Sequence, residues 1–173
     1  MKNLIILAFI CSFSVASAQD SPLKKMLITQ LKQSHNENNW FVTPNVAVLG
    51  ITAEQAMWTD KSGNHSVGQL AYHLLFWNER SLKGFKGEKN VSFKGENTET
   101  FDRFDSKQWE DVKKRLDNVM TEIETVVQNA NEDQLKEWAP TLMNIASHNA
   151  YHTGQMVFVR KLQGSWDPEK GVK

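Results

Sequence analysis

Apolar residues recur every three or four positions along most of the chain, which is the period of an amphipathic helix. The clearest example starts at Ser106, where steps of three and four alternate at Trp109, Val112, Leu116, Val119, Ile123 and Val126. This pattern predicts a long helix with one face in a hydrophobic core. Stretches that alternate apolar and polar residues, as a half-buried strand would, are almost absent. We therefore expect an all-α fold.

Capping residues mark the starts of the earlier helices. Ser21 stands before Pro22, a residue that is favoured in the first turn because its missing N–H has no partner there anyway. Thr52 and Ser66 are each followed by Gln at the spacing of a capping box. The first of these boxes predicts a short helix, and the second predicts a longer helix that ends near Phe85.

Prolines, glycines and polar clusters set the remaining boundaries. The polar residues 128–131 should end the long helix, and a short helical turn should follow. Pro140 is expected to begin the final helix and Gly164 to end it. The aromatic segment 40–42 and Trp166 are expected to pack back onto the core.

Residues 86–105 form a polar connection that is unusually long for a compact domain. In a helical bundle, such a connection can carry the chain back so that the next helix runs parallel to the last. We therefore expect a four-helix bundle with a long crossover between the second and third main helices. The crossover has few apolar anchors, namely Val91, Phe93, Phe101 and Phe104.

The first residues have the features of a secretory signal peptide. Lys2 precedes the apolar run 4–10, and the small residues 16–18 form a cleavage site. We expect residues 1–18 to be removed, which leaves residues 19–173 as a single exported domain. No later stretch approaches the roughly 20 apolar residues of a transmembrane helix, so no membrane attachment is expected after cleavage.

The cysteine content and the charge balance exclude several classes of function for this chain. Cleavage would remove Cys11, the only cysteine, so disulfides, thiol nucleophiles and thiolate ligands are excluded from the mature chain. The full chain has 20 basic and 20 acidic residues. This balance gives no electrostatic reason to expect nucleic acid or an anionic membrane as a partner.

Three histidines fall on faces that should be buried. His148 and His152 are one helical turn apart, and His73 lies on the apolar face of the second main helix. A lone buried histidine is more often a hydrogen-bonded core residue than a metal ligand. Three unpaired buried imidazoles would cost several kcal/mol, and a shared divalent ion would satisfy them all. The face that carries the pair also has Leu142, Ile145, Met156 and Val159.

Three neutral imidazoles leave one coordination position for water or substrate, as in catalytic zinc sites. We expect zinc or nickel, although cobalt and iron also accept imidazole. Ligand histidines usually donate their second N–H to another acceptor, and Asn144 and Gln155 are placed where they can accept it. Amides on a helix are also often simply solvated.

The other polar residues near these faces give weaker predictions. His35 and His65 fall in polar connections, so we expect both at the surface. Glu79 projects away from His73, which argues against a role as general base. Arg80 shares the face of His73 and is placed to meet an anionic substrate, but an arginine that extends its head to solvent is the simpler interpretation.

Two segments resemble the motifs of the DinB/YfiT-like family. They are Ser66-Val67-Gly68-Gln69-Leu70-Ala71-Tyr72-His73-Leu74 and His148-Asn149-Ala150-Tyr151-His152-Thr153-Gly154-Gln155-Met156. The resemblance implies a four-helix bundle of up-down-down-up topology. It also implies a divalent metal held by three histidines, which by motif position are His73, His148 and His152.

The resemblance implies several activities. Members of the family include thiol-dependent S-transferases or isomerases and metal-dependent hydrolases. Export is unusual for this family, and small reducing thiols are scarce outside the cytoplasm, so a thiol-dependent reaction is disfavoured here.

Three functions remain open from the sequence. The first is an exported metal-dependent hydrolase or transferase that acts on a small molecule. The second is a non-catalytic module that binds a metal or is stabilised by it, because no convincing general base is apparent. The third is a helical interaction module that forms a homodimer through exposed aromatic residues. The catalytic residues and the substrate are not identified by the sequence.

Overall fold

The computed structural model describes residues 20–37, 39–60, 62–89, 92–103 and 105–171. The expected signal peptide and two of the expected crossover anchors, Val91 and Phe104, lie outside these residues. The described part of the chain contains six α-helices and no β-strand, so the predicted all-α class is confirmed. None of the described helices is long and apolar enough to cross a membrane.

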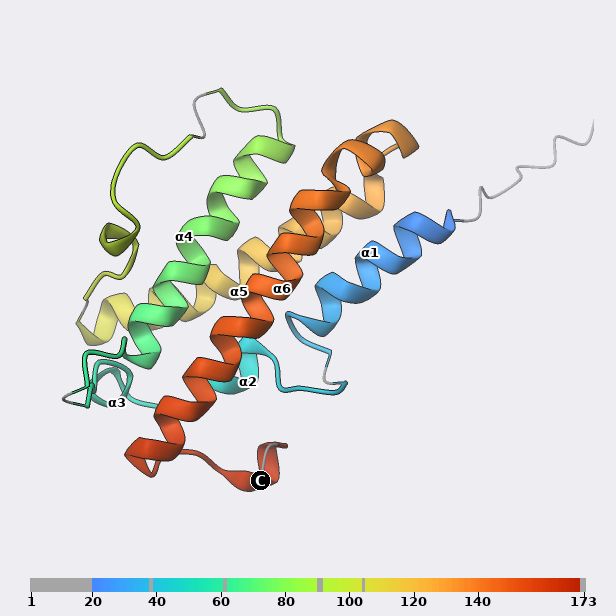
Figure 1. Cartoon of the computed structure of the whole chain (residues 1–173). Helices are drawn as coiled ribbons and strands as arrows, with labels where there is room; N and C mark the ends of the chain where they lie inside the picture. The colour runs from blue at the N-terminus through green and yellow to red at the C-terminus, as the bar shows by residue number, and fades with distance from the viewer. Residues whose placement is uncertain (1–19, 38, 61, 90–91, 104, 172–173) are drawn as a thin grey trace, which may run out of the picture.

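Four long helices make up most of the fold (Figure 1). They are α1 (Pro22–Gln33), α4 (Val67–Phe85), α5 (Ser106–Asn129) and α6 (Glu132–Gln163). Helices α1 and α4 each pack against both α5 and α6. The contact between α4 and α6 brings the face of His73 against the face of His148 and His152.

Short helices fill the connections. Helices α2 (Pro44–Val48) and α3 (Ala53–Ala56) lie between α1 and α4 in the chain, and α2 packs against α6. One turn of 3-10 helix, η1 (Asn97–Thr100), lies in the long crossover and packs against α4. A second, η2 (Pro168–Lys170), follows α6.

The start of α4 is fixed by the predicted capping box. Ser66 Oγ accepts from the backbone N–H of Gln69 at 3.1 Å, and Gln69 Oε1 accepts from the backbone N–H of Ser66 at 3.0 Å. Both bonds satisfy N–H groups that the first helical turn leaves without partners. The box therefore sets the register that turns His73 towards α6. Thr52 and Gln55 form the same pair of bonds at the start of α3, which confirms the other predicted box.

The final helix differs from its prediction. Pro140 does not begin α6 but lies inside it, because α6 is continuous from Glu132. Proline in a helix interior removes one hydrogen bond and costs about 3 kcal/mol. Packing offsets this cost: Leu135 is fully buried, and Trp138 packs on Phe85 of α4 with ring centroids 5.0 Å apart. Gly164 ends the helix in a left-handed conformation, as predicted.

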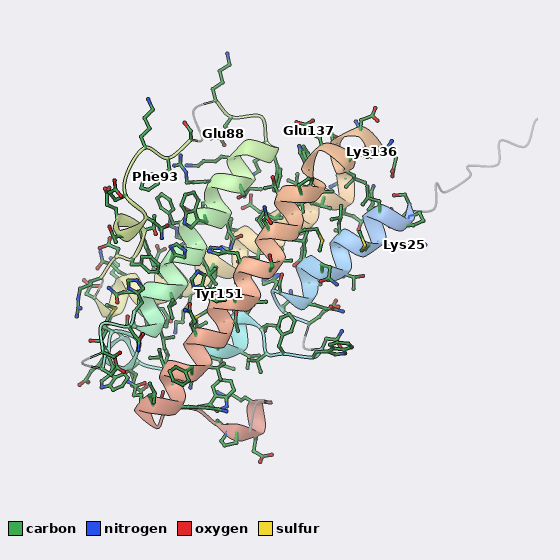
Figure 2. The ribbon with its side chains drawn as sticks, viewed as in Figure 1. Lys25, Glu88, Phe93, Lys136, Glu137 and Tyr151 are labelled. Atoms are coloured by element: carbon green, nitrogen blue, oxygen red, sulfur yellow. The ribbon has the colours of Figure 1, made fainter. Side chains whose placement is uncertain are left out.

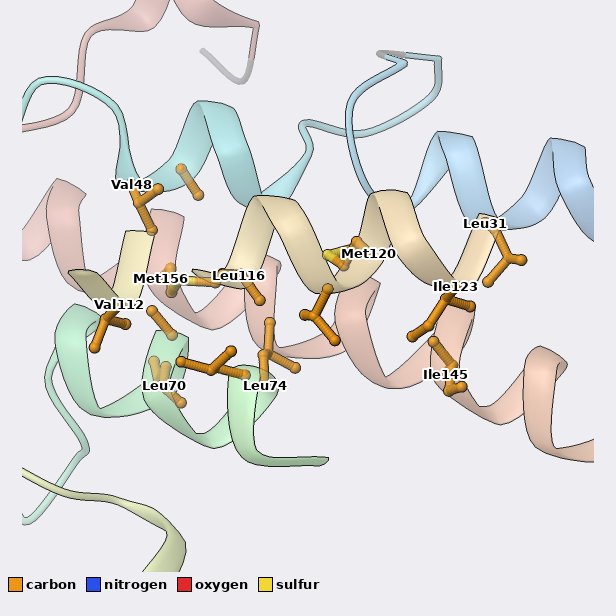
Figure 3. Close-up of a cluster of buried hydrophobic side chains, with 14 of the residues drawn as sticks. Leu31, Val48, Leu70, Leu74, Val112, Leu116, Met120, Ile123, Ile145 and Met156 are labelled. Carbon is orange, nitrogen blue, oxygen red and sulfur yellow. The ribbon is translucent and has the colours of Figure 1, made fainter. Parts of the chain in front are cut away.

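The core runs between all four long helices. Trp109 on α5 is completely buried, and its indole N–H donates to the carbonyl of Ile51 at 3.2 Å. The stripe predicted on α5 is confirmed as core, with Val126 only partly buried. Each fully buried Leu or Ile contributes roughly 1.5–3 kcal/mol. Figure 3 labels part of this core, including Leu31, Val48, Leu70, Leu74, Leu116, Ile123, Ile145 and Met156.

The expected packing of segment 40–42 is only partly correct. Val42 is buried, but Trp40 is 94% exposed and Phe41 is 40% exposed. Val42 is the residue of this segment that reaches the core just before α2, which leaves Trp40 on the solvent side. Trp166 does pack back, under the guanidinium of Arg160.

Candidate metal centre

Three imidazoles from two helices meet between α4 and α6. His73 Nε2 lies 3.2 Å from His148 Nε2, and His152 Nε2 lies 3.0 Å from the same atom. The potential ligand atoms of the three residues all lie within 4.8 Å of one another. His73 and His152 are buried, and His148 is partly exposed. The structure therefore brings together the three histidines that the sequence singled out.

These separations fit a shared ion. Two nitrogens bound to a tetrahedral zinc at bond lengths of about 2.0–2.1 Å are themselves about 3.3 Å apart. The two Nε2 distances from His148 lie close to that value. Among the described residues, this is the group of histidine and acidic side chains whose geometry is suited to holding a metal ion.

Thr100 fixes the orientation and tautomer of His73. Thr100 Oγ1 lies 2.6 Å from His73 Nδ1, and the hydroxyl also donates to the carbonyl of Asn97 at 2.6 Å. Because a hydroxyl has one proton and it is used on Asn97, Thr100 must accept from His73 Nδ1–H. The Nε2 atom of His73 is then unprotonated, with its lone pair towards the other histidines.

Gln155 has the same effect on His152. Gln155 Oε1 lies 2.6 Å from His152 Nδ1, while its amide nitrogen donates to the hydroxyl of Tyr151 at 3.3 Å. An amide oxygen only accepts, so His152 carries its proton on Nδ1 and presents a lone pair at Nε2. Two of the three imidazoles are thus held in the tautomer that binds a metal through Nε2.

The electrostatics of the centre also favour neutral imidazoles. Burial, together with the neighbouring histidines His152, His148 and His65, lowers the pKa of His73 to about 3. Burial and His152 lower the pKa of His148 to about 4. The pKa of His152 is lowered by burial and by His65, against the opposing effect of its bond to Gln155. A metal therefore meets little competition from protons near neutral pH.

The two amides predicted to support the histidines behave differently. Gln155 makes the contact described above. Asn144 is exposed at the edge of the cleft, and the described residues show no hydrogen bond between it and a histidine. Thr100 was not predicted, because it lies in the crossover, far from His73 in sequence and in no helical register with it.

An open cleft of about 730 Å³ gives access to the three histidines. Its walls are apolar or uncharged and polar, and the residues that line it include no Asp, Glu, Lys or Arg. Tyr151, about halfway along α6 in Figure 2, lies at the cleft with its ring against His152. The cleft thus suits an uncharged part of a ligand. Other lining residues are Trp77, Asn97, Phe101, Ile145 and Ser147.

Phe101 closes one side of the centre by stacking. Its ring lies parallel to His73 at 4.1 Å and parallel to His65 at 3.7 Å, so the three rings form one stack. His65 is therefore partly buried, rather than simply at the surface as expected. Phe101, like its neighbour Thr100, belongs to the crossover. The crossover thus contributes two consecutive residues that hold His73.

The prediction that His35 lies at the surface is wrong. His35, which follows the end of α1, is completely buried, with Nδ1 2.6 Å from Glu124 and Nε2 2.9 Å from Asp117, both on α5. Burial opposes protonation, but the bonds to the two carboxylates outweigh it and raise the pKa of His35. Its two partners lie on opposite sides of the ring, so this is an ion-pair cluster rather than a chelating site.

Two charged residues of α4, Glu79 and Arg80, lie near His73 in sequence. Glu79 pairs with Arg115 of α5 at 2.7 Å, so it is directed away from the histidines, as expected. Arg80 lies with its guanidinium over the rings of Phe76 and Phe93, at 5.4 and 5.5 Å from their centroids. No carboxylate lines the cleft itself, so the described residues provide no acidic general base there.

An all-helical fold with three imidazoles converging at an open cleft defines a class of helical proteins whose site is compatible with a divalent metal. Comparison with known families gives the particular group. The sequence model of the DinB superfamily matches residues 45–157, and the chain belongs to this family. The matched region runs from α2 to near the end of α6 and contains all three histidines. No curated protein and no solved structure matches the chain.

Proposed function

We propose that the protein is an exported, metal-dependent hydrolase or transferase in which His73, His148 and His152 hold one divalent ion, zinc or nickel. The observation that carries the proposal is the convergence of three Nε2 atoms at an open cleft. Hydrogen bonds from Nδ1 to Thr100 and Gln155 fix the tautomers of two of the histidines. A structural metal site is usually closed, whereas three ligands at a cleft leave a position for substrate.

We also propose that α1, α4, α5 and α6 form a four-helix bundle of up-down-down-up topology. Two features support it. The contacts form a closed ring, in which α1 and α4 each pack on α5 and α6. The long crossover between α4 and α5 gives the chain enough length to return to the end at which α4 began.

When bound, the ion would polarise a substrate group or activate a water molecule. The protein's own contribution is to hold the imidazoles and to orient the substrate. Thr100 and Gln155 keep the Nε2 lone pairs of two ligands directed inward. The hydroxyl of Tyr151 accepts from Gln155, so its own proton is available for donation to a molecule in the cleft.

Metal analysis tests the proposal directly. The mature protein, purified without a histidine tag, should contain close to one divalent ion per chain, and His148→Ala should abolish binding. Asn144→Ala is the matched control, because Asn144 lies on the same helix and at the same cleft, but its side chain makes no hydrogen bond to a histidine among the described residues. Metal-free wild-type protein with an intact fold would refute the proposal.

The cleft also favours a second function. Because no carboxylate among the described residues lines it, the cleft offers no acidic general base, and a bound ion would then only stabilise the fold. Chelation separates the two functions. A large fall in melting temperature, without metal-dependent turnover against panels of hydrolase and transferase substrates, would support the non-catalytic module. Turnover that disappears with the metal would support the enzyme.

Export is a separate part of the proposal. It is supported by the charged, apolar and small-residue pattern of residues 1–18. When the full chain is expressed in a bacterium with a periplasm, the protein should be recovered from the periplasm with Gln19 as its first residue. Retention of Met1 in the cytoplasmic fraction would contradict it.

A further inference from the structure

A second hollow, of about 370 Å³, adjoins the cleft. The two share Trp77, Ser81 and Thr141 as lining residues. The hollow lies towards the end of α4 and the beginning of α6, since Phe85 and Glu137 also line it. In Figure 2, Glu137 lies near the start of α6 and Tyr151 about halfway along it. A single ligand can therefore extend from the histidines along α4 and α6 into the hollow.

The two parts of this groove differ in charge. The cleft at the histidines is lined by no Lys, Arg, Asp or Glu, whereas the hollow is lined by Arg80 and Glu137. Any charge on an extended ligand is thus better placed at the hollow than at the histidines.

Arg80 is held in place by aromatic rings. Its guanidinium lies over both Phe76 of α4 and Phe93 of the crossover. A guanidinium carries a planar set of N–H donors that match the two oxygens of a carboxylate. An arginine that lines a hollow therefore has the donor geometry to bind a carboxylate there.

Helix α4 sets the distance between the histidine end and the Arg80 end of the groove. His73 and Arg80 lie on the same face, seven residues apart, which corresponds to about 10 Å along the helix. Trp77 lies between them, in edge contact with His73 at 6.4 Å and with Phe93 at 5.8 Å. The section of the groove between the ion and the arginine is thus bordered by an indole ring, which favours an apolar ligand body.

We propose that this groove binds an elongated substrate with a carboxylate at one end, held by Arg80, and an apolar body along Trp77. The other end carries the group that reaches the ion. The inference rests on the proposed metal function. Glu137 lines the same hollow and repels the carboxylate, so it weakens this contact rather than forming it.

Two hydroxamic acids test the inference on zinc-loaded mature protein. Octanohydroxamic acid and suberic acid monohydroxamate have the same number of carbons, and both bind zinc through the hydroxamate, but only the second ends in a carboxylate. Calorimetric titration should show that the carboxylate probe binds about tenfold more tightly, as expected for hydrogen bonds to a charged group. Succinic acid monohydroxamate, which is too short to reach Arg80, should lose this advantage.

Variants identify the residue responsible. Arg80→Met keeps an apolar stem over the rings, and it should remove the advantage of the carboxylate probe without changing the affinity for octanohydroxamic acid. Lys83→Met is the matched control, because Lys83 is an exposed cation on the next turn of α4 and lines neither cavity. Glu137→Gln should increase the advantage.

The outcomes separate this inference from the proposed function. Protein that takes up no zinc would overturn the proposed function and the inference with it. Zinc-loaded protein that binds the two octanoyl-length probes equally would overturn the inference alone. The same conclusion would follow if the advantage survived Arg80→Met, or if Lys83→Met abolished it.

Discussion

Thr100 Oγ1 accepts a hydrogen bond from His73 Nδ1 at 2.6 Å while donating its own proton to the carbonyl of Asn97. A residue of the crossover thus determines which nitrogen of a histidine on α4 is available for a metal. The crossover is therefore part of the site as well as a connection.

Thr100→Val should weaken zinc binding by about 10–100-fold, because it removes the acceptor that holds His73 in the required tautomer. Valine has nearly the same shape as threonine, so packing changes little. Competition with a chromogenic chelator measures the effect, and Thr100→Ser, which keeps the hydroxyl, should retain most of the affinity. Equal affinity for the valine variant and the wild type would refute the role assigned to Thr100.

The two amides of α6 provide a matched pair. Gln155→Leu removes the acceptor for His152 Nδ1 and should also weaken zinc binding by about 10–100-fold. Asn144→Leu changes an amide of the exposed cleft edge that makes no hydrogen bond to a histidine in the described part of the chain, so affinity should be unchanged. Similar losses in both variants would show that Asn144 supports the ligands as well.

Zinc binding should persist to unusually low pH. Burial and neighbouring imidazoles lower the pKa of His148 to about 4 and that of His73 to about 3. Protons therefore compete poorly, and affinity should stay level below pH 6.5 and fall only as the pH approaches about 4. The metal-free protein should lose stability as pH falls below 6.5, because the unfolded chain takes up these protons first. Loss of zinc centred near pH 6.5 would contradict the prediction.

His35 should stabilise the fold in the opposite pH range. Its folded-state pKa is raised, while the unfolded chain has a pKa near 6.5. Its contribution is therefore complete below pH 6.5 and is lost as pH rises through the folded-state value. Urea unfolding should show His35→Gln destabilised by about 2 kcal/mol at pH 6, and by less at pH 9. A difference that does not change with pH would mean that His35 is not charged in the fold.

Pro140→Ala should stabilise the protein. It restores the N–H that can donate to the carbonyl of Lys136 inside α6, at an exposed position where alanine meets no obstacle. The gain in free energy of unfolding should approach about 3 kcal/mol, measured by urea titration. Destabilisation would mean that the proline shapes the first turns of α6 to pack against α4.

Local signals in the sequence predicted much of the fold. The stripe that begins at Ser106, the capping boxes at Thr52 and Ser66, and Gly164 depend on residues close together in the chain, and each lies where expected. The three histidines were found in the same way, because their helical faces are readable from periodicity alone.

Contacts between distant segments were not predictable in this way. His35 is buried because Glu124 and Asp117 arrive on another helix, and Thr100 meets His73 only after the crossover folds back. Pro140 and Trp40 show the converse, because their local sequence preferences suggested positions that the fold does not give them. Packing at Leu135 and Trp138 overrides a local preference of proline, and the aromatic character of Trp40 does not ensure a place in the core.

Helix α6 remains unbroken from Glu132 to Gln163 in spite of its internal proline. Glu137 at the hollow, Thr141 between the two cavities, and the histidines His148 and His152 therefore lie on one continuous helix. Loop movements alone cannot change the spacing between them. The length of α6 between Thr141 and His148 therefore fixes how far apart the hollow and the histidines lie, and a ligand that reaches both must match that distance.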